Sequence, residues 1–426
     1  MKLVKTSTTE KALLVVVDWI HRDDWTDEDS LIELVELVKT THTEVKEKVV
    51  CRLDRPNSAY FIGKGKVEEI VQISRVNDID VVVFSEDLSG TQQRNLEEII
   101  KIKTIDRTQL ILDIFSQHAK SPEGNLQVEL AQLEYLLPRL AGKGIVLSRL
   151  GGGIGTRGPG EKKIEVDRRR IRSRITKLKR DLKDLSAHRR TIRKKRAKNI
   201  LASVALVGYT NAGKSTVLNA LTGANQIVKN SLFTTLDPLS RNLTLPNKQT
   251  IVISDTVGFL YHLPHHLIEA FKATLEEVRE ADILLNVLDI SHPKFIEHNK
   301  AVCEVLKQLQ SVEKPTITIL NKIDLVADKT WIRNLEEDFP NTVTISALNK
   351  ENINELIEKI TNELSSSTTL FKAIIPFNRM DLVDLIHREG QVKSKQFTPE
   401  GINIHAILPS ITASKIMSYK DIVSLS

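Results

Sequence analysis

Residues 204–221 read VALVGYTNAGKSTVLNAL, an apolar run followed by a glycine-bearing loop and a helix-forming stretch. Residues 208–215 fit the pattern G-x-x-x-x-G-K-S, whose backbone N–H groups surround phosphate oxygens. The pattern is informative here because a strand-like run leads into it and a helix-like run leaves it. This stretch therefore predicts a phosphate-binding loop in a doubly wound α/β domain, with the ligand at the carboxyl ends of the strands.

Two side chains of this loop carry the expected chemistry. The ammonium of Lys214 would neutralise the β- and γ-phosphates, and the hydroxyl of Ser215 would bind Mg²⁺. Asn211 could help a monovalent cation such as K⁺ bind beside the phosphates. The nucleotide contacts expected in and just after the loop are Gly208, Tyr209, Thr210, Asn211, Ala212, Gly213, Lys214, Ser215 and Thr216.

A second motif, Asp255-Thr256-Val257-Gly258, ends the next apolar strand. Asp255 would hold Mg²⁺ through its water shell, and the N–H of Gly258 would approach the γ-phosphate more closely than a side chain would allow. Thr235 is the best candidate for a switch threonine that binds Mg²⁺ only with the γ-phosphate present, and Thr234 is its rival. Further nucleotide contacts are expected at Phe233, Thr256 and Val257. The predicted metal ligands are Ser215, Thr235 and Asp255, and the predicted catalytic residues are Lys214, Thr235, Asp255 and Gly258.

Two later motifs predict which nucleotide base the site binds. The carboxylate of Asp324 in Asn321-Lys322-Ile323-Asp324 can accept both N1–H and the 2-amino group of guanine, which adenine cannot donate. Asn321 would brace the phosphate loop, and the stem of Lys322 would cover the base. In Ser346-Ala347-Leu348 the N–H of Ala347 would point at O6 of guanine. Four motifs in this order predict an enzyme that hydrolyses GTP.

The sequence lacks one residue that many GTPases use in the hydrolytic step. Phe259 follows Gly258 at the position where many GTPases carry a glutamine that orients the attacking water. A phenyl ring cannot hydrogen-bond to water. We therefore expect slow intrinsic turnover that a partner raises, or water orientation by another group such as a switch backbone.

The 426 residues are too many for one core and predict several domains. The expected division is a small α/β domain over 1–124, a helical hairpin over 125–198, the nucleotide domain over 199–365 and a small α/β domain over 366–426. With 41% hydrophobic residues the chain can bury its cores. Its apolar runs are too short to cross a bilayer, which favours a cytoplasmic protein, and Cys51 and Cys303 are expected to be ordinary buried thiols.

The helical hairpin is predicted from a change in the spacing of apolar residues along the chain. Apolar residues follow a 4-3-4-3 spacing at Leu126, Leu130, Leu133, Leu137 and Leu140, and again at Ile171, Ile175, Leu178, Leu182 and Leu185. Between these seams, residues 151–160 hold six of the chain's 18 glycines and would form a flexible cationic tip or a plain linker.

The second helix is strongly basic. Residues 161–198 contain 18 Lys or Arg against 5 Asp or Glu, whereas the whole chain has a net charge of only +6. Such a segment favours a polyanion such as RNA, although a solvated coiled-coil face is the alternative. The candidate RNA contacts are Lys143, Arg149, Arg157, Lys162, Lys163, Arg189, Arg190, Arg193 and Lys194.

With these motifs in view, the chain resembles the HflX family of ribosome-associated GTPases over nearly its whole length. The resemblance rests on stretches outside the common GTPase motifs, namely Gly63-Lys64-Gly65-Lys66, Gln92–Glu97, Gln127–Leu133, Gly151–Glu161, Leu263–Leu267 and Ala270–Glu277. Lys162-Lys163 departs from the family's usual Thr-Gln after the glycine tract. The resemblance implies a factor that binds the large ribosomal subunit, approaches rRNA near the peptidyl-transferase centre and splits stalled or idle ribosomes. We expect this factor to be a monomer whose GTP hydrolysis controls its release.

Two other functions stay open at this stage. One is a ribosome assembly or antibiotic-protection GTPase that acts on the large subunit without splitting ribosomes. The other is a membrane-surface adaptor that uses the basic segment on anionic lipid. The coiled-coil seam offers no aromatic face for insertion, so the sequence favours at most weak membrane association and no stable insertion.

Overall fold

The computed structural model of the chain describes residues 9–19, 25–140, 159–197, 202–224, 232–233, 239–247, 249–261, 272–328, 330–332, 335, 339, 341–366, 368–419 and 422–424. Internal contacts divide the chain into two compact units. Unit 1 comprises Met1–Lys183, Lys229–Asp237 and Leu260–Thr274, and unit 2 comprises Asp184–Val228, Pro238–Phe259 and Leu275–Ser426. The finer division into four domains stays a prediction.

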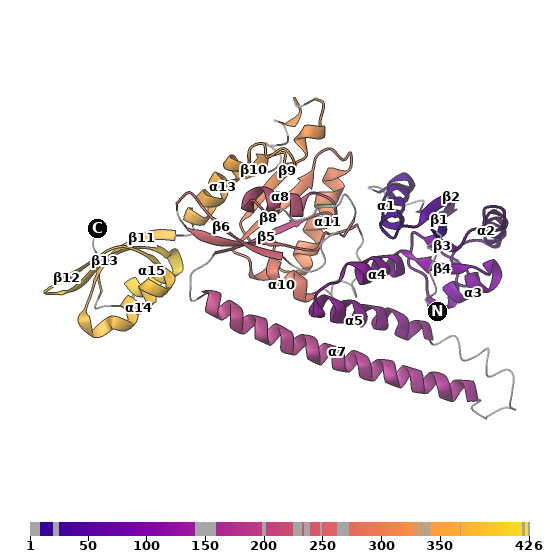
Figure 1. Cartoon of the computed structure of the whole chain (residues 1–426), viewed down its shortest axis with the longest axis horizontal. Helices are drawn as coiled ribbons and strands as arrows, with labels where there is room; N and C mark the ends of the chain where they lie inside the picture. The colour runs from indigo at the N-terminus through magenta and orange to yellow at the C-terminus, as the bar shows by residue number, and fades with distance from the viewer. Residues whose placement is uncertain are drawn as a thin grey trace, which may run out of the picture. The chain divides into compact units, whose positions relative to one another are not determined.

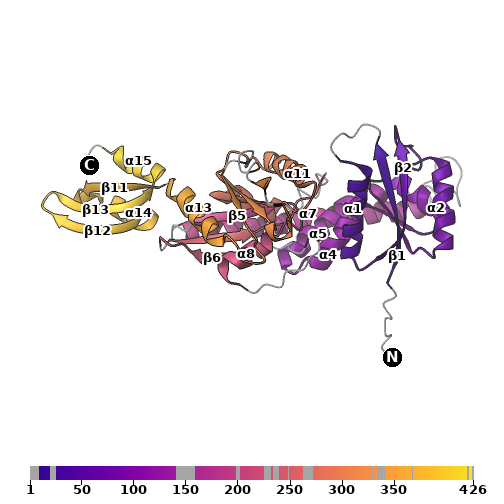
Figure 2. The ribbon, with the colours of Figure 1, turned by 90° about the horizontal axis from the view of Figure 1, so that it is seen from above.

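Unit 1 begins with a parallel sheet covered by helices on both faces. Its strand order is β2-β1-β3-β4, and β1 and β3 are buried apolar runs, as expected of central strands in such a sheet. Helices α1 and α4 pack together on one face, and α2 and α3 on the other (Figures 1 and 2). The elements are β1 (Lys11–Trp19), α1 (Asp27–Thr40), β2 (Glu44–Leu53), α2 (Lys64–Val76), β3 (Val81–Phe84), α3 (Gly90–Ile100), β4 (Lys103–Asp106) and α4 (Arg107–His118).

The predicted helical hairpin is present. Figure 1 shows α5 (Pro122–Arg139) beside α7 (Pro159–Ala197), with the two helices running in opposite directions. The apolar seam centres on Leu130, Ile175 and Leu178, and further seam residues pack around them at Leu126, Leu133, Leu137, Ile171 and Leu182. Ion pairs from Arg174 to Glu129 (2.6 Å) and from Lys179 to Glu134 (2.8 Å) flank the seam.

Unit 2 is built on a six-stranded sheet of order β10-β9-β8-β5-β7-β6, in which only β6 runs antiparallel to its neighbour. Its strands are β5 (Ala202–Gly208), β6 (Leu239–Thr244), β7 (Thr250–Asp255), β8 (Ile283–Asp289), β9 (Thr316–Asn321) and β10 (Thr342–Thr344). The helices are α8 (Lys214–Thr222), α10 (Lys272–Glu280), α11 (Phe295–Gln308), the 3-10 helix η2 (Ile323–Leu325) and α13 (Ile353–Ser366). Alternation of strand and helix places the loops after β5, β7 and β9 at one edge of the sheet.

The last sixty residues form an antiparallel sheet of order β12-β13-β11-β14. The order along the chain is β-α-β-β-α-β, a recurrent split motif. It runs β11 (Thr368–Ile375), 3-10 helix η3 (Phe377–Arg379), α14 (Met380–Glu389), β12 (Gln391–Thr398), β13 (Gly401–Pro409), α15 (Ser410–Met417) and β14 (Val423–Ser424). Helices α14 and α15 pack on the sheet over a core that includes Phe371, Ile404 and Ile416.

Two expectations from the sequence concern single residues and membranes. Cys51 is buried, which raises the pKa of its thiol to about 11, whereas Cys303 is only partly buried. The expectation of two buried thiols holds for Cys51 and was wrong for Cys303. None of the helices in the described part of the chain combines the length and apolar character needed to span a bilayer.

Candidate functional site

The loop between β5 and α8 has a shape that requires glycine at two positions. Gly208 and Gly213 have φ values of +149° and +98°, which side-chain-bearing residues rarely adopt. A Cβ atom on Gly208 would lie 2.4 Å from the carbonyl oxygen of Val287, and one on Gly213 would lie 2.4 Å from Nδ2 of Asn321. The loop therefore packs directly against neighbouring strands while α8 begins at Lys214, so that the helix N-terminus faces the loop.

The three predicted polar groups of the phosphate site lie together. Ser215 donates a 2.6 Å hydrogen bond from Oγ to Oδ2 of Asp255, whose side chain is fully buried at the end of β7. The Nζ of Lys214 donates to the carbonyl oxygens of Gly208 (3.1 Å) and Tyr209 (2.8 Å). Burial lowers the pKa of Lys214 to about 8, and the nearby charge of Asp255 opposes that shift.

The side-chain oxygens of Ser215 and Asp255 are suitable ligands for Mg²⁺. A hydroxyl and a carboxylate are hard oxygen ligands, and Mg²⁺ is commonly bound by one or two such groups together with phosphate oxygens and water. No group of three or more His, Cys, Asp or Glu side chains is placed to hold a metal within the described residues. At P-loop sites, Mg²⁺ held by such a pair of ligands also binds phosphate oxygens of the nucleotide.

The segment after Asp255 is fixed to the phosphate loop by its backbone. The N–H of Phe259 donates to the carbonyl of Gly208 (3.1 Å), and the N–H of Thr210 donates to the carbonyl of Phe259 (2.8 Å). A Cβ on Gly258 would lie 2.7 Å from Cα of Thr210 and 3.0 Å from Nζ of Lys214. Only glycine can therefore bring this N–H so close to the loop. The ring of Phe259 is buried and offers no hydrogen bond.

The base motifs converge from β9 and β10. Asn321 donates from Nδ2 to the carbonyl of Ala212 (2.9 Å), which is the brace predicted for the phosphate loop, and accepts from the N–H of Ala347 (3.1 Å). Ser346 donates from Oγ to Oδ1 of Asp324 (2.6 Å), which orients the carboxylate. Leu348 lies outside this network and is 74% exposed.

Several predicted site residues are not brought into this cluster. Phe233 is buried against Phe115 of α4, with ring centroids 4.5 Å apart in an edge-to-face contact inside unit 1. Thr234 and Thr235 lie outside the described residues, as do Lys143, Arg149 and Arg157 of the hairpin tip. The backbone of the remaining RNA candidates is part of α7, but their side chains lie outside the described part of the chain. These candidates are Lys162, Lys163, Arg189, Arg190, Arg193 and Lys194.

Two contacts at the site had no signal in the sequence. Asp289 at the end of β8 accepts a 2.5 Å hydrogen bond from Nζ of Lys322, which fixes the side chain expected to cover the base. Tyr209 of the phosphate loop stacks on His298 of α11, with centroids 3.8 Å apart and planes 7° from parallel. Each partner lies far along the chain from the motif residue that it contacts. Only the fold brings them to the site.

The loop, the buried Ser215–Asp255 pair and the braced base motifs define the protein as a P-loop GTPase, an enzyme that hydrolyses GTP. Three protein families that match consecutive stretches of the chain are GTPase families, in agreement with this class. Residues 28–116 match the family described as "GTP-binding GTPase N-terminal", residues 118–196 match "GTP-binding GTPase Middle Region", and residues 203–322 match "50S ribosome-binding GTPase".

Relatives narrow the class to one family. The chain is 46% identical to the GTPase HflX of Caldanaerobacter subterraneus, over 93% of this chain and 90% of the relative. It is 39% identical to the GTPase HflX of Escherichia coli, over 92% of this chain and 89% of the relative. A solved GTP-binding protein of Sulfolobus solfataricus, in complex with GDP, is 25% identical over 84% of this chain and 99% of that chain, with a TM-score of 0.45. The chain belongs to the HflX family of ribosome-associated GTPases.

Proposed function

We propose that this GTPase binds the large ribosomal subunit near the peptidyl-transferase centre and splits stalled or idle ribosomes, with GTP hydrolysis controlling its release. It would act in the cytoplasm as a monomer. The observation that carries the proposal is the presence, in one chain, of a GTPase site and of a long basic helix, α7, that contains none of the nucleotide-binding motifs. Family membership supports a ribosomal partner, and the charge of the helix supports contact with its RNA.

The described part of α7 has basic side chains available for such a contact. Arg172, Lys177 and Arg180 are exposed and form no ion pair with the residues that the structure describes. Arg174 and Lys179, in contrast, are paired across the hairpin with α5. The helix therefore separates cations that hold the hairpin together from cations that can neutralise RNA phosphates, which give strong and salt-dependent affinity.

The roles proposed within the GTP site follow its geometry. Lys214 would leave its two loop carbonyls for the β- and γ-phosphates, Ser215 and Asp255 would hold Mg²⁺, and Asp324 would select guanine. Thr235 would complete the Mg²⁺ shell with the γ-phosphate present, and Asn211 would assist K⁺. Because Phe259 cannot orient water, the large subunit would have to raise a slow intrinsic turnover.

Co-sedimentation with ribosomal particles tests the proposal. The full chain, with GTP, GDP or a non-hydrolysable GTP analogue, is mixed with intact ribosomes and separated on a sucrose gradient. We expect intact ribosomes to give way to subunits with GTP or its analogue, and the chain to remain on the large subunit with the analogue. Binding to large subunits while ribosomes stay intact would instead favour an assembly or antibiotic-protection factor.

A charge variant with a matched control tests the RNA contact. Changing Arg172, Lys177 and Arg180 to Gln should weaken large-subunit binding and reduce its dependence on salt concentration, since fewer counterions are released. Changing three exposed cations elsewhere, Lys48, Arg75 and Lys307, removes the same charge and should leave binding near normal. Equal effects of the two triple variants would show that only net charge matters.

A further inference from the structure

The C-terminal sheet has one face that α14 and α15 do not cover. Both helices pack on the side where Phe371 of β11 and Ile404 of β13 belong to the core (Figure 1). Because successive side chains of a strand point to opposite faces, the residues between the core positions point away from these helices. They are partly or fully exposed, and Leu370 is 54% exposed. The sheet therefore has a second surface on which a partner can bind.

The strand register places the side chains of this surface next to one another. Three directly paired positions of β11 and β13 make up its middle, namely Leu370 with Ile407, Lys372 with His405, and Ile374 with Asn403. On the neighbouring strand β12, Ser394 pairs with His405, and Gln396 pairs with Asn403. Together these eight residues form the open face of the sheet, which combines apolar, basic and amide side chains.

The strands of this sheet carry positive charge and no acidic residue. Strands β11, β12, β13 and β14 contain three lysines and one histidine, and no Asp or Glu. Acidic residues nearby lie elsewhere, at Asp381 and Asp384 of α14 and at Glu400 in the turn between β12 and β13. A basic surface without carboxylates attracts a polyanion.

The middle of the open face suits an unpaired RNA base. His405 and Lys372 lie directly opposite each other on the two central strands. An imidazole ring can stack on the face of a base, and an ammonium group can neutralise the phosphate next to it. Ile374 and Ile407 supply apolar surface on either side of this pair. Four-stranded sheets that recognise RNA hold two or three unpaired bases in this way.

Asn403 adds a hydrogen-bonding group to the same face. Its Oδ1 is buried and accepts no hydrogen bond from the residues that the structure describes. A buried acceptor without a donor is unfavourable, so rotation of this amide toward a base that carries N–H groups would remove an energetic cost. Gln396 lies beside it on β12 and offers a second amide. The two amides can therefore contact the edge of a base that stacks on His405.

We propose that the open face of the C-terminal sheet binds single-stranded RNA. His405 stacks on a base, Lys372 neutralises a phosphate, and the amide of Asn403 contacts the edge of a base. This inference goes beyond the contact proposed for α7, because a basic helix binds the RNA backbone whether or not the bases are paired, whereas the open face requires unpaired bases.

Fluorescence anisotropy tests the proposal with the full chain in excess GDP and Mg²⁺, which fill the GTP site. The labelled probes are hexamers of uridine, adenosine or cytidine, an RNA duplex of twelve base pairs, and a peptide of six glutamates. They are titrated with the unchanged chain and with the Gln variant of Arg172, Lys177 and Arg180. We expect both chains to bind at least one hexamer equally well, and the triple variant to bind the duplex and the peptide much more weakly than that hexamer.

Variants assign the binding to the open face. His405→Ala should weaken hexamer binding about tenfold through the loss of stacking, whereas His405→Phe, which keeps a stacking ring, should retain it. Lys372→Gln should weaken binding and reduce its dependence on salt concentration. The matched controls are Lys395→Gln and Phe397→Ala, at exposed positions of β12 that pair with core residues and so lie on the other side of the sheet. Both controls should bind the hexamer normally.

The thermal unfolding midpoint and basal GTP hydrolysis of each variant confirm that it is folded. Loss of hexamer binding in the triple variant would assign the RNA to α7 and overturn the proposal. It is also overturned if no hexamer binds, if the glutamate peptide binds as tightly as the hexamer, or if the open-face variants bind as well as the controls.

Discussion

Asp324 is the residue on which base selection depends. Its Oδ1 is held by Ser346, and the same loop is tied to the phosphate loop through Asn321, so the carboxylate is positioned before a base arrives. Preorganised acceptors discriminate strongly because a mismatched base leaves buried polar groups unsatisfied.

Asp324→Asn is expected to weaken GTP binding about a thousandfold, on the order of 4 kcal/mol, and to favour xanthosine triphosphate. The amide presents a donor where guanine also donates. Titrating both nucleotides measures the effect. Asp328→Asn, a few residues away on the surface, is the control and should bind GTP normally. Unchanged GTP affinity in Asp324→Asn would remove this carboxylate from the base site.

Lys214 should make nucleotide binding depend on pH. Burial lowers its pKa to about 8, and bound phosphates would raise that pKa by stabilising the ammonium. Below pH 8 the side chain is protonated with or without nucleotide, so this group leaves affinity unchanged. Above pH 8 binding must take up a proton, and affinity should fall by up to about tenfold per pH unit.

Calorimetry with GDP at pH 7.0 and pH 8.5, in two buffers of different ionisation heat, measures that proton uptake. We expect uptake only at the higher pH. Lys214→Arg is the control, because a guanidinium stays charged throughout this range. Absence of uptake in the unchanged chain at pH 8.5 would show that Lys214 is already fully charged there.

At the scale of elements, the hairpin is held by a narrow seam, and Leu178 is its fully buried centre. Leu178→Ala should lower the free energy of unfolding by about 2–4 kcal/mol, because it leaves a cavity between α5 and α7. Val166→Ala, at a position on α7 that is 44% exposed, should change it by less than about 0.5 kcal/mol. Chemical denaturation of the full chain compares the two. Equal small effects would mean that the seam contributes little stability.

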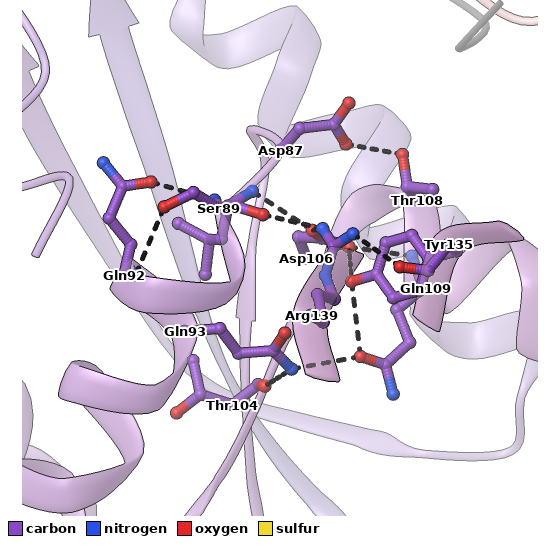
Figure 3. A network of polar contacts seen from close by, with 11 residues as sticks. Asp87, Ser89, Gln92, Gln93, Thr104, Asp106, Thr108, Gln109, Tyr135 and Arg139 are labelled. Carbon is purple, nitrogen blue, oxygen red and sulfur yellow. Dashed lines mark hydrogen bonds and ion pairs between the residues drawn. The ribbon is translucent and has the colours of Figure 1, made fainter. Parts of the chain in front are cut away.

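The sequence predicted elements best where a pattern is local. The apolar run that leads into the phosphate loop corresponds to β5, and the apolar strand that ends at Asp255 corresponds to β7. Strand β6 was missed because its sequence, LSRNLT, is largely polar, as an exposed edge strand can be. The network of hydrogen bonds around Asp106, which Figure 3 shows, was missed for another reason. Its members lie on β4, α4 and α5, and only tertiary packing brings Tyr135 and Arg139 to that carboxylate.

The residues of the candidate site also fall into those that a local motif predicts and those that only tertiary packing brings together. The phosphate loop, Asp255 and the Asn321 brace follow from motif spacing, since a strand, a tight loop and a helix fix their own geometry. The partners Asp289 and His298 come from other elements and carry no motif. Phe233 was predicted as a nucleotide contact, but its ring is buried against Phe115 of α4, because a large aromatic side chain gains more from an apolar core than from a polar loop.

At the scale of the whole molecule, the excess positive charge and the GTP site lie in different parts of the chain. The net charge of +6 hides an excess of 13 positive charges over residues 161–198, so the remainder of the chain is acidic. We expect such a chain to be directed to RNA through its basic helix, because the remaining residues carry a net negative charge. In the proposed function, the hairpin contacts the ribosome and the GTP site sets the timing of release.

Light scattering of intact ribosomes tests this division most directly. Residues 151–160 are replaced by a Ser-Asn linker of equal length, and the fall in scattering after addition of the chain with GTP reports splitting. The unchanged chain should split ribosomes. The linker variant should keep normal GTP affinity and basal hydrolysis but lose splitting, because the phosphate loop begins about fifty residues later, in unit 2. Splitting by the linker variant at the normal rate would contradict the account and reduce the glycine tract to a connector.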